Sequence, residues 1–308
     1  MRPKIVVVGS SNTDLVVKLP RLPQPGETII GGTFSVASGG KGANQAVAAA
    51  RAGGNVTFIA RVGDDHFGKQ AIEGFKIDGV DVKAIGVSPG TSSGIALIFV
   101  DERGENFIGV ASGANNEFSP SDLERASDTL ASADILLLQF EIPLSTVQAA
   151  IRTASRAGVR VILNPAPARN FDPELYKLIS VITPNEIETE ILTGIHVSDD
   201  ASMANAAASL LDRGVSVVVI TLGARGAFLA EAGRNEFIPA FKVTPVDTTA
   251  AGDVFSGALA VSLGEHSSMN DAVRFASAAA AISVTRLGAQ PSAPRRDEIE
   301  HLLRSGWS

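Results

Sequence analysis

The chain has 308 residues, with 26 basic and 33 acidic side chains, a formal net charge of −7 and no cysteine. The absence of cysteine excludes a disulfide framework, a cysteine-ligated metal centre and a cysteine nucleophile. Because nucleic-acid-binding proteins carry clustered positive charge, the acidic balance argues against DNA or RNA as a partner. With 45% hydrophobic and 19% charged residues, the composition is typical of a folded protein with a large core. We expect a single domain over residues 1–308.

The chain shows no signal for a membrane or a secretory route. Its first apolar run, residues 5–8, is too short for the core of a signal peptide. No run reaches the ~18 apolar residues of a membrane-spanning helix. We therefore expect a cytoplasmic protein that has no membrane partner and that binds a small molecule.

Short runs rich in valine and isoleucine alternate with longer stretches of helical composition along the chain. We expect strands at residues 4–9, 56–62, 135–140, 159–163, 181–183 and 215–222, and helices at residues 40–53, 67–77, 121–132, 145–157, 201–213, 252–263, 270–285 and 296–304. Strands without polar alternation are buried on both faces, which is typical of a parallel sheet covered by helices. The alternation predicts an α/β fold with a doubly wound, mainly parallel sheet.

Two segments, residues 13–37 and 92–110, interrupt this alternation. The first contains strand-like pieces at residues 15–19 and 28–34, and the second has the pattern of a hairpin with strands at residues 95–100 and 106–110. Because no crossover helix follows either segment, we expect both to leave the main sheet and to pair as a small lid of about four strands. An extension of the edge of the main sheet is the alternative.

The strongest local motif is DTTAAGD at residues 247–253, which follows an extended stretch at residues 237–246 and opens a helix. Its small residues allow a ligand to approach the backbone closely. The unpaired amides of a helix N-terminus, together with the helix dipole, favour an anion. Asp253 is then either a first-turn acidic residue that complements the dipole or a general base beside an anion site, as phosphoryl transfer requires.

A second motif, GGKGAN at residues 39–44, opens another helix. It is not a phosphate-binding P-loop, because Ser35 stands where the leading glycine belongs and Gly42 follows Lys41 in place of Ser or Thr. Three glycines and a lysine at a helix N-terminus suit contact with a polar ligand. A glycine-rich helix cap with a solvated lysine explains the motif equally well.

Three further motifs follow expected strands: SSNTD at residues 10–14, TPNEIE at residues 183–188 and TLGARG at residues 221–226. Open α/β sheets bind their ligands at the carboxyl ends of the strands. Asn185 and Glu188 share one helix face, an arrangement that can hold the waters of Mg²⁺ or simply cap the helix. The other two motifs can equally be ordinary turns.

Hydrolase and histidine–metal chemistry find no support. The sequence GTSSG at residues 90–94 matches the nucleophile elbow of serine hydrolases, but that elbow must lie between a strand and a helix, and an expected strand follows here. The four histidines are scattered and lack the spacing of a metal-binding pair.

In combination, these motifs resemble the PfkB family of carbohydrate kinases. The sequence DTTAAGDVFSGA at residues 247–258 resembles the C-terminal signature of the family, and GGKGANQAVA at residues 39–48 resembles its N-terminal signature. The segments NPAPA (164–168), TPNEIE (183–188), TLGARG (221–226) and GAQPS (288–292) match in the same order. The resemblance covers residues 8–299.

The resemblance implies a Rossmann-like α/β domain with a β-sheet lid, often dimerised through the lids. It implies ATP-dependent phosphorylation of a sugar, in the best-matching branch D-ribose at its 5-hydroxyl, with Mg²⁺ and a monovalent cation, typically K⁺, as cofactors. A kinase for 2-deoxyribose or fructose is the nearest alternative. A non-catalytic sugar- or nucleotide-binding protein is the alternative from a different class.

The resemblance also implies a role for each matching position. The sugar would contact Asn12, Thr13, Asp14, Gly40, Lys41, Gly42, Ala43, Asn44 and Glu141. Asp253 would be the base, and the amides of Ala250, Ala251 and Gly252 would form the anion hole. The nucleotide would contact Asn185, Thr221, Leu222, Gly223, Ala224, Arg225, Gly226 and Ser277, together with Gly252 and Asp253. Glu188 would organise Mg²⁺ through water, and the monovalent cation would lie among Asp247, Thr249, Ser283, Arg286, Gly288 and Ser292, several of them acting through backbone carbonyls.

Overall fold

Nine strands form the central sheet of the computed structural model, which describes residues 2–305. In chain order they are β1 (Lys4–Val8), β4 (Asn55–Gly63), β5 (Ile85–Ser88), β8 (Ile135–Leu138), β9 (Arg160–Leu163), β10 (Val181–Ile182), β11 (Val217–Thr221), β12 (Gly226–Glu231) and β13 (Arg234–Pro239). Their order across the sheet is β13-β12-β11-β10-β9-β8-β1-β4-β5. Every neighbouring pair is parallel except β11–β12 and β12–β13. The predicted doubly wound, mainly parallel sheet is confirmed.

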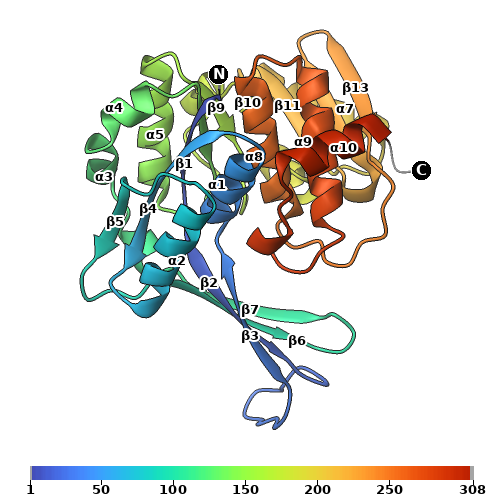
Figure 1. The fold of residues 1–308 in the computed structure, drawn as a ribbon. Helices are drawn as coiled ribbons and strands as arrows, with labels where there is room; N and C mark the ends of the chain where they lie inside the picture. Colours follow the sequence, from blue (N-terminus) through green and yellow to red (C-terminus); the bar gives the residue numbers. More distant parts are fainter. Residues whose placement is uncertain (1, 306–308) are drawn as a thin grey trace.

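Helices cover both faces of this sheet (Figure 1). They are α1 (Lys41–Arg51), α2 (His66–Ile77), α3 (Pro120–Glu124), α4 (Ser127–Ala131), α5 (Leu144–Arg156), α6 (Glu186–Thr193), α7 (Asp200–Asp212), α8 (Ala251–Gly264), α9 (Met269–Ser283) and α10 (Arg296–Ser305). Successive side chains of a strand face opposite sides of a sheet. Ile5 and Val7 of β1 therefore pack in one core with α1, α8 and α9, whereas Val6 and Val8 pack in the other core with α5 and α7. No helix within residues 2–305 is long and apolar enough to cross a membrane.

Several elements differ from the sequence-based expectation. The short strand β5 and the antiparallel hairpin β12–β13 were not predicted. The helix expected at residues 121–132 is divided into α3 and α4. The extended stretch expected at residues 237–246 is a strand only as far as Pro239, and residues 240–250 form neither helix nor strand.

Four further strands form a separate sheet that projects from the body of the molecule (Figure 1). They are β2 (Asn12–Lys18), β3 (Thr33–Gly39), β6 (Gly94–Val100) and β7 (Asn106–Ala111), in the order β3-β2-β6-β7. We call them the small sheet. The strand expected at residues 28–34 is wrong, because Gly31 and Gly32 have φ values of 100° and 112°, which no regular strand contains. Pairing with β2 begins only at Thr33.

The chain changes direction across the main sheet between β1 and β8. From β1 it continues to β4 and β5 on one side, whereas β8 to β11 extend on the other. Such a switch point leaves a crevice outside the carboxyl ends of the two strands, where doubly wound sheets bind ligands. The small sheet starts at the same place, since β2 begins four residues after β1 ends and β3 ends two residues before α1 begins.

Candidate active site

The base of the small sheet holds two of the side chains expected to contact a sugar. Asn12 opens β2, and its Oδ1 accepts a hydrogen bond of 2.8 Å from Asn115 Nδ2. Asp14 lies two residues further along β2, half-buried, and burial together with the charge of Glu141 raises its pKa to about 6. A Cβ atom at Gly39 would overlap the Asp14 carboxylate, so glycine at this position leaves room for the charged group. Thr13, between them, is buried.

The glycines of GGKGAN allow close packing against the end of β1. Gly40 has φ of 88°, and a Cβ atom at Gly42 would lie 2.6 Å from the carbonyl carbon of Gly9. The amide of Gly42 donates to Ser10 Oγ at 3.4 Å, and that of Ala43 donates to Ser10 O at 2.9 Å. These two amides are therefore used within the fold and are not free to bind a ligand. Two neighbouring side chains, Lys41 and Asn44, face the ionised groups of the crevice.

Lys41 lies among carboxylates from three other elements. The charge of Asp253 raises the pKa of Lys41 most strongly, and Glu141 and Glu188 act in the same direction against burial. Glu141, just beyond β8, uses its Oε2 to accept from Lys41 N at 2.9 Å and from Ser10 Oγ at 2.6 Å. Glu141 therefore caps the start of α1, which fixes its carboxylate at the mouth of the crevice.

Asp253 lies in the first turn of α8 and is 4% exposed. Its Oδ2 accepts from Asn44 Nδ2 and its Oδ1 from Gln45 Nε2, both at 3.0 Å. Burial raises the pKa of Asp253, although Lys41 and the two amide donors act to lower it. Asn44 Oδ1 is buried and has no hydrogen-bond partner within residues 2–305. An acceptor in this position suits a ligand hydroxyl.

The helix that carries Asp253 begins without a side-chain cap. Ala250 occupies the N-cap position with φ of 60°, and no side chain bonds to the first-turn amides. Gly252 is exposed. The first amides of a helix are strong donors to anions when nothing else caps them. Ala251 N already donates to Thr248 O at 3.3 Å, so the amides of Gly252 and Asp253 remain as the candidate donors of the predicted anion site.

A cavity of about 410 Å³ opens beside this helix terminus. Six of the residues expected to contact a nucleotide line this cavity: Thr221, Gly223, Ala224, Gly226, Gly252 and Ser277. Ala251 lines it as well. Sequence reasoning missed the rest of the wall, namely Ala240, Phe241, Lys242, Val243, Pro245, Thr248, Phe255, Ala280, Ala281 and Val284. The apolar residues of the irregular segment 240–245 were the available signal, although Phe241 and Val243 also pack against the core and so do not point to a cavity by themselves.

Four of the expected nucleotide contacts do not line the cavity, and one of them is Asp253, whose carboxylate bonds to Asn44 and Gln45. Leu222 is buried in the core, and Arg225 forms an ion pair of 2.5 Å with Glu186. Asn185 lies at the rim, where its backbone pairs with that of Thr221.

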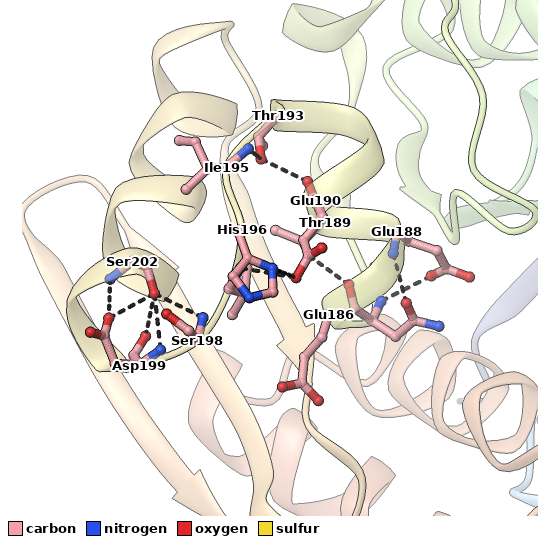
Figure 2. A network of polar contacts seen from close by, with 12 residues as sticks. Glu186, Glu188, Thr189, Glu190, Thr193, Ile195, His196, Ser198, Asp199 and Ser202 are labelled. Atoms are coloured by element: carbon pink, nitrogen blue, oxygen red, sulfur yellow. Dashed lines mark hydrogen bonds and ion pairs between the residues drawn. The ribbon is translucent and has the colours of Figure 1, made fainter.

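Asn185 and Glu188 form the cap of α6. Asn185 Oδ1 accepts from Glu188 N at 2.8 Å, and Glu188 Oε2 accepts from Asn185 N at 2.9 Å. Both bonds lie at the N-terminal end of α6, away from Glu190 and His196 (Figure 2). Burial raises the pKa of Glu188, and the charge of Lys41 acts against that effect. Glu188 is thus both a capping residue and a member of the charged group around Lys41.

The residues expected around a monovalent cation come from two segments that Asp247 joins. Its Oδ1 accepts from Thr249 N at 2.9 Å and its Oδ2 from Gly288 N at 2.8 Å. The hydroxyls of Ser283 and Ser292 bond to carbonyls three residues earlier, and Arg286 pairs with Glu298 instead. Residues 2–305 contain no group of three or more acidic or histidine side chains that could hold a metal ion. A cation here would depend on backbone carbonyl oxygens.

Comparison with known proteins agrees with this architecture. Residues 2–296 match the family described as pfkB family carbohydrate kinase. The chain is 46% identical over 303 residues to a protein of Haemophilus influenzae named ribokinase, covering 98% of this chain and 99% of the relative. It is 38% identical over 300 residues to a deoxyribokinase of Salmonella typhimurium, covering 97% and 98% of the two chains. The solved structure of Arabidopsis thaliana ribokinase complexed with ribose and ATP superposes with a TM-score of 0.92 at 36% identity, covering 100% of both chains. The chain therefore belongs to the pfkB family of carbohydrate kinases.

Proposed function

We propose that this kinase transfers the γ-phosphoryl group of ATP to the 5-hydroxyl of D-ribose, giving D-ribose 5-phosphate and ADP. The observation that carries the proposal is the position of Asp253. Its buried carboxylate lies in the first turn of a helix that has no side-chain cap and bonds to Asn44 and Gln45 of α1, and the preceding residues Ala251 and Gly252 line the 410 Å³ cavity. The ribokinase names of several relatives, and the ribose and ATP bound to the Arabidopsis thaliana structure, support these two substrates.

In the proposed reaction, Asp253 accepts the proton of the 5-hydroxyl while that oxygen attacks the γ-phosphorus and the bond to the ADP oxygen breaks. Burial raises the pKa of Asp253, which makes the carboxylate a stronger base. The amides of Gly252 and Asp253, which no side chain caps, donate to the phosphoryl oxygens as negative charge spreads over them. Lys41 supplies a positive charge within the same crevice.

The sugar lies, in this proposal, between the small sheet and α1. A carboxylate accepts hydrogen bonds from two neighbouring hydroxyls, which suits Asp14 to the ring. The unpartnered Oδ1 of Asn44 takes a third hydroxyl. Asn12 donates through its Nδ2, because Asn115 already donates to its Oδ1. Two adjacent hydroxyls on the ring are what distinguish ribose from 2-deoxyribose.

ATP places its base, in this proposal, against the apolar wall formed by Phe241 and Val243 and its phosphates toward Gly252. The oxygen atoms available as metal ligands also suit two cations. One oxygen of Glu188 is used in the helix cap, which leaves the other for water on Mg²⁺. Backbone carbonyl oxygens of the two segments that Asp247 joins would hold K⁺. When bound, Mg²⁺ and K⁺ neutralise negative charge on the phosphates.

We further propose a cytoplasmic homodimer that forms through the small sheets. Large apolar side chains are exposed on this sheet, with Phe34 at 64% and Phe107 at 71% exposure. A second copy covering them would remove this apolar surface from water. Light scattering coupled to size-exclusion chromatography tests the dimer. A monomer at micromolar concentration would contradict it.

A sugar panel tests the proposed substrate. Sugar-dependent release of ADP is measured with ribose, 2-deoxyribose and fructose, with and without K⁺. We expect the highest kcat/KM with ribose, because a site built to pair a hydroxyl strongly rejects the analogue that lacks it. A preference for 2-deoxyribose would favour the alternative that the deoxyribokinase relative represents. Calorimetric binding without turnover would indicate a non-catalytic binding protein.

A further inference from the structure

A chain of buried amide side chains lies behind Asp253, on the side away from solvent. Gln45 Nε2 lies 3.0 Å from Asp253 Oδ1 and also 3.0 Å from Asn164 Oδ1. Gln139 Nε2 lies 2.6 Å from Gln45 Oε1. Gln45 is in α1, Gln139 directly follows β8 and Asn164 directly follows β9, so the chain crosses the carboxyl edge of the main sheet. Gln45 and Gln139 have no exposed surface.

The neighbours of Gln45 determine which way its amide points. An amide side chain has one carbonyl acceptor and two N–H donors. The acceptor of Gln45 is taken by Gln139, and its two donors are taken by Asp253 and Asn164. Asn164 is itself held by a 3.0 Å bond from its Nδ2 to the carbonyl of Thr183. Gln45 therefore presents N–H, and not carbonyl oxygen, to the carboxylate.

Gln139 has little freedom to release Gln45. It packs against Gly9, where an added Cβ atom would overlap Gln139 Oε1. That oxygen has no hydrogen-bond partner within residues 2–305. In the part of the chain that the structure describes, the side chain of Gln139 makes one hydrogen bond, and that bond orients Gln45.

We propose that Gln45 is a positioning residue for phosphoryl transfer: it fixes the rotation of the Asp253 carboxylate and stabilises its ionised form, in an orientation that Gln139 imposes. The inference rests on the proposed function, in which Asp253 is the base. Asn44, the donor to the other oxygen of Asp253, is itself a proposed sugar contact. Gln45 has no proposed contact with sugar or ATP, so its effect on the reaction passes through Asp253 alone.

Charged groups from three elements also face Asp253. They are Lys41 from α1, Glu141 from the segment after β8 and Glu188 from α6. All three remain in place when Gln45 is changed. A donor to the ionised carboxylate lowers its pKa, so removal of that donor raises it. The change in proton affinity can therefore be assigned to Gln45.

The test compares Gln45→Met, Gln45→Glu and Gln139→Met with Asp253→Asn, measuring kcat, KM for ribose and the dependence of kcat on pH. Loss of partners that orient a functional group typically costs ~10–100-fold in activity. We expect Gln45→Met to lower kcat by that amount, with KM for ribose changed less than about 3-fold, and to move the acid limb of the pH profile to higher pH. Gln45→Glu should move it further, because a second carboxyl would stand beside Asp253. Gln139→Met should act in the same direction with a smaller loss.

Thr146→Val is the matched control. Thr146 is fully buried in α5 and donates to the carbonyl of Phe118 at 2.5 Å, and the apolar residues of α5 pack in a different core from those of α8. It should lose stability without any change in kcat or in the pH profile. If Gln45→Met does not fold, Gln139→Met decides, since it leaves Gln45 in place.

The outcomes separate the two proposals. Normal kcat and an unshifted pH profile in the Gln45 and Gln139 variants, with inactive Asp253→Asn, would overturn the role of Gln45 and leave Asp253 as the base. Near-normal turnover in Asp253→Asn would overturn the assignment of Asp253 as the base and, with it, the role of Gln45, whereas an absence of ribose-dependent turnover in the unmodified protein would overturn the proposed function. A loss of kcat with a shifted acid limb in the Gln45 variants, and inactive Asp253→Asn, would support both.

Discussion

Asn115 Nδ2 lies 2.8 Å from Asn12 Oδ1, so a residue that follows the small sheet holds the first residue of β2. Asn115 also exchanges two hydrogen bonds with the backbone of Ser11, accepting at 2.9 Å and donating at 3.1 Å. It is almost fully buried. The link makes the orientation of the Asn12 amide a property of the fold, not of the ligand.

Asn115→Asp should weaken ribose binding. The variant keeps the size of the side chain and the acceptor for Ser11, but it faces Asn12 Oδ1 with an acceptor and so favours rotation of the Asn12 amide. Loss of about one net hydrogen bond to the sugar corresponds to a KM roughly 10-fold higher. Steady-state kinetics should show this change for ribose and none for ATP. An unchanged KM for ribose would show that Asn12 does not need this orientation.

The affinity for ribose should depend on pH through Asp14. Its pKa is raised to about 6 by burial and by Glu141, so the group gains a proton as the pH falls through about 6. The ionised form accepts hydroxyl donors better, which means that binding is strong above this pH and weakens below it. Calorimetric titration of ribose between pH 5 and 8, without ATP, measures the effect. Asp14→Asn should bind weakly and without this pH dependence, and a flat profile in the unmodified protein would contradict the assignment.

Activation by K⁺ should require Asp247. Although burial acts to raise the pKa of Asp247, bonds from Thr249 and Gly288 lower it overall, so the carboxylate is charged and holds the two segments together. Asp247→Ala releases both amides. Because hydrogen bonds to charged groups contribute about 1.5–3 kcal/mol, we expect kcat in K⁺ to fall by roughly 10-fold or more. The variant should respond little to K⁺, and full stimulation would exclude a cation site between these segments.

The ion pair of Arg51 and Asp78 should be important for stability. Their side chains are 17% and 12% exposed, with bonds of 2.7 and 3.0 Å, and Arg51 also donates to the carbonyls of Gln290 and Ala293. Arg51→Met leaves the Asp78 carboxylate unpaired and should cost about 2–3 kcal/mol of unfolding free energy. Denaturant unfolding measures the loss. Lys76→Ala, which removes an exposed pair with Glu73, is the control and should have no measurable effect.

The sequence was most informative where a local pattern determines the structure. Asp253 and the amides before it could be placed because a helix start is a local feature, and the structure puts them at the start of α8. The carboxyl ends of β1 and β8 could be placed because the alternation of strands and helices determines a doubly wound sheet. The hairpin β12–β13 escaped prediction because its strands carry charged and small residues that resemble a loop.

Contacts between distant residues could not be predicted in the same way. Gln45 and Asp253 are 208 positions apart, and Gln45 and Asn164 are 119 positions apart. In the sequence, Gln45 is one polar residue in an alanine-rich helix, with no sign that it is buried beside a carboxylate. The shift of β3 was different, because Gly31 and Gly32 were visible and mark the point where a regular strand cannot continue.

The most direct test of the account is the turnover of Asp253→Asn with ribose and ATP. Asparagine keeps the size of the side chain but cannot accept the proton of the 5-hydroxyl. Positioned acid–base catalysis contributes ~10²–10⁴-fold, so sugar-dependent ADP release should fall at least that far while calorimetric binding of ribose persists. Turnover within a few-fold of the unmodified protein would contradict the assignment of Asp253 as the base.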